Sequence, residues 1–412
     1  MTNEQEKCLI DKVRKYIKEH VTLEPLSDEQ LDALIEELVN REIGSGYCSI
    51  DQKVSICTQI YSMIRGFGIL DTILKDHTIT EVMINGHKNI FVEKDGRIVK
   101  LAEQFDSEKR LLDVIDRIIS SAGRTVSRAK PIVDARLEDG SRVNVVLPPV
   151  ALCGPTMTIR KFSKTPMNID RLIELGAITQ DIANQLELMV KAKYNIFISG
   201  GTGSGKTTFL NALSNYIPSD ERVITIEDSA ELKIVGIKNL VSLETRDSNM
   251  AGEGQISMQQ LIKSSLRMRP DRIVVGEVRG SEALDMLQAM NTGHDGSLST
   301  GHANSPADML LRLETMVLQG ASGLPLEAIR RQISSAIDIV IHLSRMRDKS
   351  RKVVQICQIV GYKNGEIEIE PLYTFQEDRN STVDKVSGTL VRTKNPLKRV
   401  TKRENAGINI TI

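Results

Sequence analysis

A glycine-rich segment near the middle of the chain carries the most specific chemistry in this sequence. Its residues are Gly200, Gly201, Thr202, Gly203, Ser204, Gly205, Lys206, Thr207 and Thr208. Glycines at this spacing let the backbone curl so that several N–H groups point at one phosphate group. The amine of Lys206 can reach the β- and γ-phosphates, and the hydroxyl of Thr207 can hold Mg²⁺. The segment therefore predicts a site for a nucleoside triphosphate.

The residues on either side of this segment have the pattern that a phosphate loop requires. The short apolar run at 195–199 reads as a strand, and residues 209–213 read as a helix. A helix that begins directly after the loop would turn its positive N-terminal end toward the phosphates. An ordinary glycine-rich turn is the alternative, but it would not require a strand before it and a helix after it.

Hydrolysis of the nucleotide would require acidic groups that hold Mg²⁺ and orient a water molecule. Two predicted strands, at 223–226 and 273–275, run into acidic residues. These acids are Glu227, Asp228 and Glu231 after the first strand and Glu277 after the second. In an open α/β sheet, ligands gather at the carboxyl ends of the strands, so we expect these carboxylates to lie beside the phosphate loop. The alternative is that they cap the helices that follow.

Two of the six histidines, His294 and His302, lie in a small, polar segment at 292–306 that contains three glycines. A metal site would require more ligands, and no cysteine is nearby. We expect the histidines to sense the γ-phosphate or to couple its presence to a domain movement. A surface turn with incidental histidines is the alternative.

Two arginines in an earlier part of the chain could complete such a site. Arg142 follows the turn at Asp139 and Gly140, and Arg160 ends a predicted strand at 156–160. Exposed arginines usually serve only to keep a surface hydrated. These two are of interest because nucleotide motors often complete the site with an arginine from another domain or subunit.

These residues require elements to position them, and a chain of 412 residues is long enough for two or three domains. We expect helices from 1 to 65, an α+β domain from 66 to 162 and a linker from 163 to 171. Strands and helices then alternate, which is typical of a parallel sheet with helices on both faces, and we expect this α/β domain from 172 to 375. A polar tail from 376 to 412 would follow, loosely ordered in its last part.

Local signals support this division. Residues 27–30 are typical of a capping box at the start of a helix. The apolar residues at 111–119 fall on one face of a second predicted helix. Turn residues flanked by alternating apolar residues predict hairpins at 85–86, 139–140 and 364–365.

The composition argues against several classes of protein. Basic and acidic residues both number 54, so the formal net charge is +0, and aromatics are 3% with no tryptophan. Neither bulk charge nor stacking platforms therefore support direct binding of nucleic acid. The five cysteines form no CxxC pair, which argues against a zinc site or a disulfide framework.

The sequence also bears on the membrane. No apolar run approaches the roughly 18 residues that span a bilayer, and the first residues are too charged for a signal peptide. We therefore expect a cytoplasmic protein that reaches a membrane only through a partner. Basic residues at 394–403 could touch anionic lipid, but a solvated tail is the simpler interpretation.

Taken in order, four segments of this chain resemble the type II/type IV secretion ATPase superfamily. The loop at 200–208 resembles its Walker A motif, residues 225–232 its aspartate box, residues 266–280 its Walker B region and residues 294–302 its histidine box. The resemblance spans about residues 66–343. It implies a RecA-like P-loop ATPase domain preceded by a smaller α+β domain.

Within this superfamily, the chain looks most like the CpaF-type branch, the motors of tight-adherence (Flp) pili. Residues 134–144, the prolines at 148–149 and residues 289–296 are similar to that branch. The helical N-terminal segment fits as well. The last third holds only Cys357, so the tetracysteine motif of many type II secretion motors is absent from the sequence.

The resemblance also implies a role for each candidate residue. Lys206 and Thr207 would hold the phosphates and Mg²⁺, and Glu277 would take the Walker B place beside Mg²⁺. Glu227 or Glu231 would polarise the attacking water. The remaining candidates would contact or sense the phosphates, namely His294, His302, Arg142 and Arg160.

It further implies a homo-hexameric ring at the cytoplasmic face of an inner membrane, where the ring moves a membrane platform with ATP and Mg²⁺ as cofactors. The expected function is an ATP-hydrolysing motor for assembly of Flp/Tad-type pili or for protein secretion. A type IV secretion or conjugation motor and a pilus retraction ATPase are close alternatives. A nucleic-acid motor and a non-hydrolysing nucleotide-binding scaffold are more distant ones.

Overall fold

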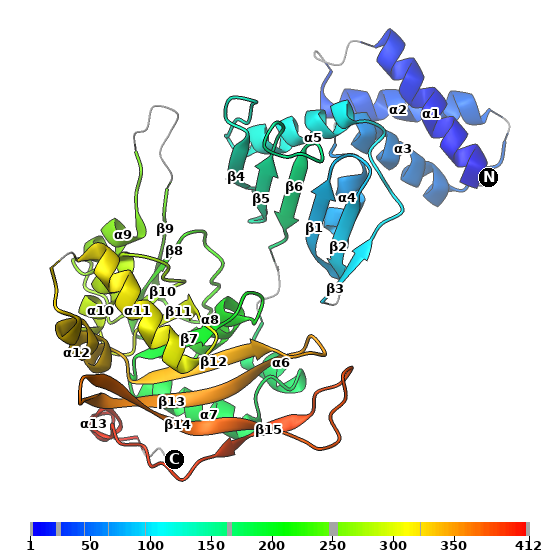
Figure 1. Cartoon of the computed structure of the whole chain (residues 1–412). Coiled ribbons are helices and arrows are strands. Elements are labelled where there is room, and N and C mark those ends of the chain that lie inside the picture. The colour runs from blue at the N-terminus through cyan, green and yellow to red at the C-terminus, as the bar shows by residue number, and fades with distance from the viewer. Residues whose placement is uncertain are drawn as a thin grey trace. The chain divides into compact units, whose positions relative to one another are not determined.

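The computed structural model describes residues 3–21, 26–44, 46–64, 66–94, 96–162, 167–246, 254–321 and 323–408. The chain divides into two units, Met1–Ser163 and Lys164–Ile412, whose elements are labelled in Figure 1. Residues 163–166 of the predicted linker lie outside the described part. The linker's end at 169–171 belongs to a helix, because α6 (Ile169–Glu174) begins there.

The first unit starts with the helices α1 (Asn3–His20), α2 (Asp28–Ile43) and α3 (Ile50–Ile64). Ser27 and Gln30 form the predicted capping box at the start of α2, since each side chain accepts a hydrogen bond from the other residue's backbone N–H. Apolar side chains of all three helices are buried against one another. The prediction of helices here is confirmed.

A six-stranded antiparallel sheet with helices follows in the same unit. In chain order its elements are α4 (Ile69–Lys75), β1 (Ile79–Asn85), β2 (Ile90–Lys94), β3 (Arg97–Lys100), α5 (Glu108–Ser121), β4 (Ile132–Arg136), β5 (Arg142–Val146) and β6 (Thr156–Arg160). The strand order is β3-β2-β1-β6-β5-β4. The apolar face of α5 packs on this sheet, as Figure 1 shows. The predicted hairpins at 85–86 and 139–140 are the β1–β2 and β4–β5 connections.

The second unit contains a nine-stranded sheet. After α6, its elements are α7 (Gln180–Lys191), β7 (Ile196–Gly200), α8 (Lys206–Ser214), β8 (Arg222–Glu227), β9 (Asn239–Glu244), α9 (Met258–Ser265), β10 (Arg272–Val275), α10 (Glu282–Asn291), β11 (Leu298–His302), α11 (Pro306–Gly320), α12 (Leu326–Ala336), β12 (Ile339–Arg345), β13 (Arg351–Lys363), β14 (Glu366–Glu377), β15 (Gly388–Arg392) and α13 (Thr401–Asn405). The strand order is β15-β14-β13-β12-β7-β11-β10-β8-β9.

The six strands from β12 to β9 in this order are parallel to one another, as predicted, and β13, β14 and β15 extend the sheet in antiparallel pairing. Both faces are covered by helices. Ile196 and Ile198 of β7 belong to the core formed with α6, α7 and α8, whereas Phe197 between them belongs to the core formed with α9 to α12. Alternate side chains therefore face opposite layers, as expected for a central strand.

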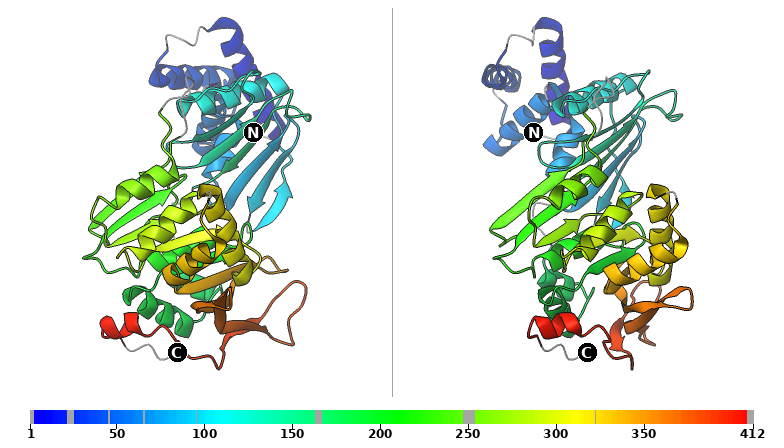
Figure 2. Two further views of the ribbon diagram at one scale, coloured as in Figure 1. Left: turned by 60° about the vertical axis from the view of Figure 1, so that its left-hand side comes forward. Right: turned by 90° about the vertical axis from the view of Figure 1, so that its left-hand side faces the viewer.

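The C-terminal part differs from the expected solvated tail. Residues 376–392 complete β14 and add β15 to the sheet, and Leu397 beyond them is buried in the core that contains α7. The hydroxyl of Tyr194 donates a hydrogen bond to the carbonyl of Arg399 at 2.5 Å. Figure 2 shows α13, in red, beside the green helices of this unit. The polar composition of this segment predicted a solvated tail. That prediction was wrong because the basic side chains of the segment pair with acidic residues that lie far away along the chain.

Asp338 is the main partner of this C-terminal segment. Its buried carboxylate accepts hydrogen bonds from the backbone N–H of Asn195 at 2.8 Å, from Arg399 at 2.8 Å and from Lys402 at 2.6 Å. Lys402 also pairs with Asp295 at 2.7 Å. The C-terminal segment is thus tied to the amino ends of β7 and β12.

Within the described residues, no helix combines the length and apolar character needed to cross a bilayer.

We expect Asp338→Ala to lower the free energy of unfolding by about 2 kcal/mol, because it leaves partly buried cations and a buried N–H without their acceptor. Denaturation in urea, followed by circular dichroism, measures the change. Glu327→Ala is the control, since Glu327 pairs with Arg331 on an exposed helix face and should cost at most about 0.5 kcal/mol. Equal effects of the two substitutions would contradict the bracing role of Asp338.

Candidate functional site

The glycine-rich loop lies between β7 and α8, as predicted. β7 is paired in parallel with β11 on one side and β12 on the other, so that Gly200 lies opposite both His302 and Leu343. A Cβ atom on Gly200 would lie 2.4 Å from the carbonyl oxygen of Leu343. Gly203 and Gly205 have φ values of +70° and +93°, which L side chains rarely adopt. Glycine is therefore required both for the close approach of β12 and for the curl of the loop.

Lys206 begins α8 and is largely buried. Its ammonium group donates a hydrogen bond to the carbonyl of Gly201 at 3.0 Å and lies 3.2 Å from Nδ1 of His302. His302 reaches this position because it ends β11, the strand next to β7. Of the two candidate histidines, this one lies at the phosphate loop.

A chain of polar contacts extends from Lys206 across the carboxyl ends of the strands. Nε2 of His302 lies 2.8 Å from Oε1 of Glu277, which follows β10. The other carboxylate oxygen of Glu277 accepts a hydrogen bond from Arg279 at 2.7 Å, and Arg279 also lies 3.6 Å from Asp228. Opposite charges thus alternate from the loop to the end of β8. Arg279 was missed as a site residue by sequence reasoning, although it lies only two positions after Glu277.

The protonation state of His302 follows from these contacts. Burial lowers the pKa of its imidazole below the ordinary 6.5, and the cationic Lys206 and Arg279 lower it further, while Glu277 acts in the opposite direction. A neutral ring lies between the two charges, with Nδ1 accepting from the ammonium of Lys206 and Nε2 facing the carboxylate of Glu277. His302 therefore links the loop lysine to the carboxylate through a neutral bridge.

The acids that follow β8 have different surroundings. Glu227 is 3% exposed, and its Oε1 accepts hydrogen bonds from the backbone N–H groups of Glu231 at 2.9 Å and Leu232 at 3.0 Å. A Cβ on Gly276 would lie 2.9 Å from Cγ of Glu227, so this side chain packs against the residue before Glu277. One oxygen of Glu227 thus holds the turn after β8, while the side chain still borders the site. The next element is the strand β9, so this contact is not the helix cap of the alternative interpretation.

His294 is placed elsewhere. It precedes the amino end of β11, and its Nδ1 lies 3.2 Å from the carbonyl of Ala289 at the end of α10. The phosphate loop lies at the carboxyl end of the neighbouring β7. β11 separates the two histidines along its whole length, so the structure does not bring His294 to the group around Lys206.

Arg142 and Arg160 lie in the first unit, directly opposite each other on β5 and β6. Arg136 of β4 lies directly opposite Arg142 in turn. Residues directly opposite in an antiparallel sheet share a face, so three arginines form a row, and such like-charge neighbours disfavour folding unless an anion or an acid compensates. Arg136 was missed because its spacing in the sequence carries no signal of this pairing.

The residues present fit a bound Mg²⁺. Among the described residues, no group of three or more histidine, cysteine, aspartate or glutamate side chains is arranged to hold a metal ion. Mg²⁺ in a phosphate site needs only one or two protein groups, because phosphate and water oxygens complete its coordination. Thr207 in the first turn of α8 and the carboxylate of Glu277 would supply that donor set.

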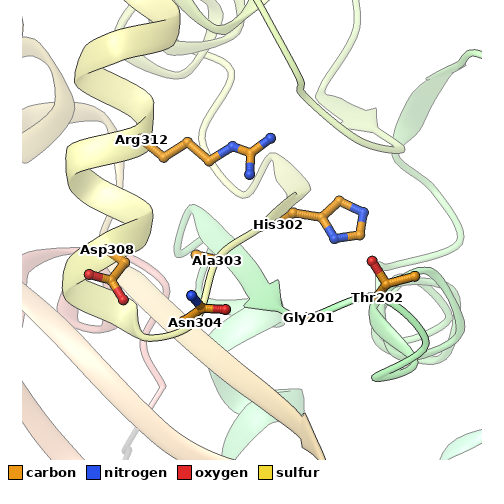
Figure 3. Close-up of a pocket in the computed structure, with 7 residues that line it drawn as sticks. All are labelled: Gly201, Thr202, His302, Ala303, Asn304, Asp308 and Arg312. Atoms are coloured by element: carbon orange, nitrogen blue, oxygen red, sulfur yellow. The ribbon is translucent and has the colours of Figure 1, made fainter.

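A cavity of about 510 Å³ opens beside the loop, lined by Gly201, Thr202, His302, Ala303, Asn304, Asp308 and Arg312. Figure 3 shows Arg312 of α11 and His302 extending toward the same space as Thr202. Sequence reasoning missed Arg312 because it lies within an ordinary amphipathic helix. Only the position of α11 after β11 brings its guanidinium group to this cavity.

A buried histidine, His342, lies next to the strand that leads into the loop. Nδ1 of His342 in β12 lies 2.8 Å from the hydroxyl of Ser199 in β7, one residue before Gly200. Burial lowers the pKa of His342. A neutral His342 therefore joins the two strands just before the phosphate loop, a contact that no local sequence signal indicates.

Comparison with known proteins identifies relatives of this chain. A family model described as type II/IV secretion system protein matches residues 65–402. Conjugal transfer protein TrbB of Rhizobium radiobacter is 34% identical over 309 residues, which cover 74% of this chain and 91% of TrbB. Type IV secretion system protein VirB11 of Bartonella henselae is 32% identical over 324 residues, with coverage of 70% of this chain and 90% of VirB11.

Solved structures agree on the fold. The pilus retraction motor PilT, solved with bound ADP, matches with a TM-score of 0.51 and 19% identity, covering 82% of this chain and 85% of PilT. At this identity the likeness concerns the fold alone. The expected α/β class, with a smaller α+β domain before it, is confirmed.

We expect the imidazole of His302 to titrate below 6.5, with opposite changes when its two neighbours are replaced. Lys206→Ala should raise the pKa because it removes a cation 3.2 Å away, and Glu277→Gln should lower it because it removes the compensating anion. NMR of histidine-labelled protein measures both shifts, with His302→Gln to assign the signal. Shifts of the same sign in the two variants would contradict the bridging geometry.

Proposed function

Because the chain belongs to the type II/IV secretion system protein family, we propose that it is an ATP-hydrolysing motor. The observation that carries this proposal is the continuous set of contacts from Lys206 through His302 and Glu277 to Arg279. A site that only bound nucleotide would not need an acid held in this way beside the phosphate loop. The reaction is attack of water on the γ-phosphate, which yields ADP and phosphate.

The protein contributes position and charge to this reaction. The loop N–H groups and Lys206 hold the phosphates, and Thr207 with Glu277 would hold Mg²⁺, which neutralises the phosphate oxygens when bound. Glu227 or Glu231 would polarise the attacking water. One oxygen of the Glu227 carboxylate already holds the backbone of the turn after β8.

His302 connects the state of the phosphate site to the rest of the sheet. A γ-phosphate attracts the ammonium of Lys206, which in the present structure also contacts Nδ1 of His302. Binding of a γ-phosphate would weaken the contact between Lys206 and His302. It would thereby change how His302, at the end of β11, contacts Glu277. Hydrolysis would reverse the change, so the presence of the γ-phosphate is converted into a movement. In this proposal His302 is the sensor, and His294 is a support for the turn before β11.

The first unit would complete the site. Arg142 and Arg160, with Arg136 beside them, form a cationic row that suits a polyphosphate. Arginines supplied from a second domain or a neighbouring subunit stabilise the charge that develops during phosphoryl transfer. We propose that a homo-hexameric ring brings these arginines to the phosphates in turn.

The apparatus that this motor serves is a type II/IV secretion system. The names of TrbB and VirB11 support conjugation or type IV secretion. In this proposal the ring lies at the cytoplasmic face of an inner membrane and acts on a platform there. Assembly of Flp/Tad-type pili is the second candidate. The helical bundle α1–α3 fits the N-terminal helices that the resemblance to the CpaF-type branch led us to expect.

The first test is the rate of ATP hydrolysis with and without Mg²⁺, with the oligomeric mass measured by light scattering at the same concentrations. Mg²⁺-dependent turnover in a six-fold species supports the ring motor. A stable ring that binds ATP and never hydrolyses it would favour a nucleotide-binding scaffold instead. Stimulation of turnover by DNA would favour a nucleic-acid motor.

We expect Glu277→Gln to retain ADP binding and to reduce ATP turnover by about a hundredfold or more, because the amide keeps the shape but neither holds Mg²⁺ nor carries the charge. Isothermal titration gives the affinity, and a phosphate-release assay gives the rate. Glu187→Gln is the matched control, since Glu187 forms an exposed pair with Lys191 on α7. Loss of ADP binding in Glu277→Gln would make Glu277 a structural residue.

Arg142→Ala should lower kcat at least about tenfold without changing the melting temperature, since it removes a cation from the proposed phosphate-facing row. The same phosphate-release assay measures kcat. Arg97→Ala, on the exposed edge strand β3 of the same sheet, controls for loss of a surface charge. An unchanged kcat in Arg142→Ala would remove this row from the site.

A further inference from the structure

The hairpin between β12 and β13 emerges beside the phosphate loop. Parallel pairing of β12 with β7 places Leu343 opposite Gly200, so the chain leaves β12 where the loop begins. Arg345 ends β12 and lies directly opposite Arg351, which begins β13. Two arginines therefore lie on the side of the loop away from β11, β10 and the carboxylate of Glu277.

Arg351 makes direct contact with the loop. Its Nε–H donates a hydrogen bond to the carbonyl oxygen of Gly203 at 2.9 Å. Its Cδ lies 3.4 Å from the position that a Cβ on Gly205 would occupy. The side chain is otherwise exposed, and it forms no ion pair within the part of the chain that the structure describes. The hydrogen bond to Gly203 is thus its principal polar contact with the protein.

This contact orients one peptide group of the loop. The carbonyl of Gly203 and the N–H of Ser204 belong to the same trans peptide and point in opposite directions. Arg351 holds the carbonyl from outside, while the N–H of Ser204 is directed to the carbonyl of Gly201 at 3.3 Å. Gly203 on one side of this peptide and Gly205 directly after Ser204 would otherwise let this part of the loop rotate at little cost, and a rotated peptide would present a carbonyl to an anion.

We propose that Arg351 is a positioning residue for nucleotide binding, which keeps the phosphate loop in its receptive conformation through the carbonyl of Gly203. The proposal rests on the proposed function, since it assumes that this loop binds the phosphates of ATP. It adds a residue 148 positions beyond Gly203 to the site. Because the contact is to the loop and not to the nucleoside, it acts on every ligand that carries a diphosphate.

The same hairpin offers a matched control. Arg347 lies between Arg345 and Arg351 in the sequence, but its guanidinium pairs with Glu377 of β14 and donates to the carbonyl of Thr382 at 2.9 Å. Arg347→Ala therefore removes an arginine from the hairpin without removing a contact to the loop. Arg351→Lys keeps a cationic donor at the critical position, so it tests whether donation to Gly203 is what matters.

The experiment measures the affinity of the full-length wild type, Arg351→Ala, Arg351→Lys and Arg347→Ala for ADP and for inorganic pyrophosphate, by isothermal titration in Mg²⁺. We expect Arg351→Ala to weaken both ligands by about tenfold, the loss of one charged hydrogen bond. Arg351→Lys should recover most of the affinity, and Arg347→Ala should match the wild type. In steady-state turnover, KM for ATP should rise in Arg351→Ala with little change in kcat.

The outcomes separate this inference from the proposed function. A wild type that binds neither ADP nor pyrophosphate would defeat the proposed function itself. A wild type that binds both, with Arg351→Ala indistinguishable from Arg347→Ala, would defeat only the role of Arg351. Weaker ADP binding with unchanged pyrophosphate binding would also overturn the inference, because it would mean a contact to the nucleoside instead of to the loop.

Discussion

The position of β7 between two parallel neighbours supports the rest of this site. Pairing with β11 brings His302 opposite Gly200, and pairing with β12 brings Leu343 to the same residue. Because parallel strands end at the same edge of a sheet, the phosphate loop, His302 and the β12–β13 hairpin meet there. The absence of a side chain at Gly200 is what allows β12 to approach so closely. A change of register in either pair would separate the loop from its partners.

The charges that extend from Lys206 to Arg279 at this edge each have a neighbour of opposite sign or a neutral bridge. Lys206 and Glu277 are connected through the neutral imidazole of His302, and Arg279 balances the other oxygen of Glu277. In a partly buried site such contacts are strongly coupled, because little water screens them. A phosphate that attracts Lys206 therefore alters the surroundings of Glu277 as well. In the proposed function, this coupling would connect nucleotide binding to movement of β11.

The two ends of the central strands are built differently. At the amino end, Asp338 joins Asn195, Arg399 and Lys402 in a compact set of hydrogen bonds. At the carboxyl end, the chain uses glycines with positive φ and depends on side chains from elsewhere, such as Arg351, to hold its shape. The docking of residues 393–408 therefore supports the amino ends of the central strands, opposite the loop.

Signals confined to neighbouring residues determined much of this protein from its sequence. The loop at 200–208, the capping box at Ser27, the hairpin turns and the acid at the end of β10 all depend on contacts within a few positions, and each was predicted. The choice between His294 and His302, the row of arginines with Arg136, the contact of Arg351 and the docking of the C-terminal segment were decided only by tertiary structure. Lys206 and His302 are 96 residues apart, and Gly203 and Arg351 are 148 apart. Such pairs meet only through strand order and register, which depend on the packing of the whole sheet.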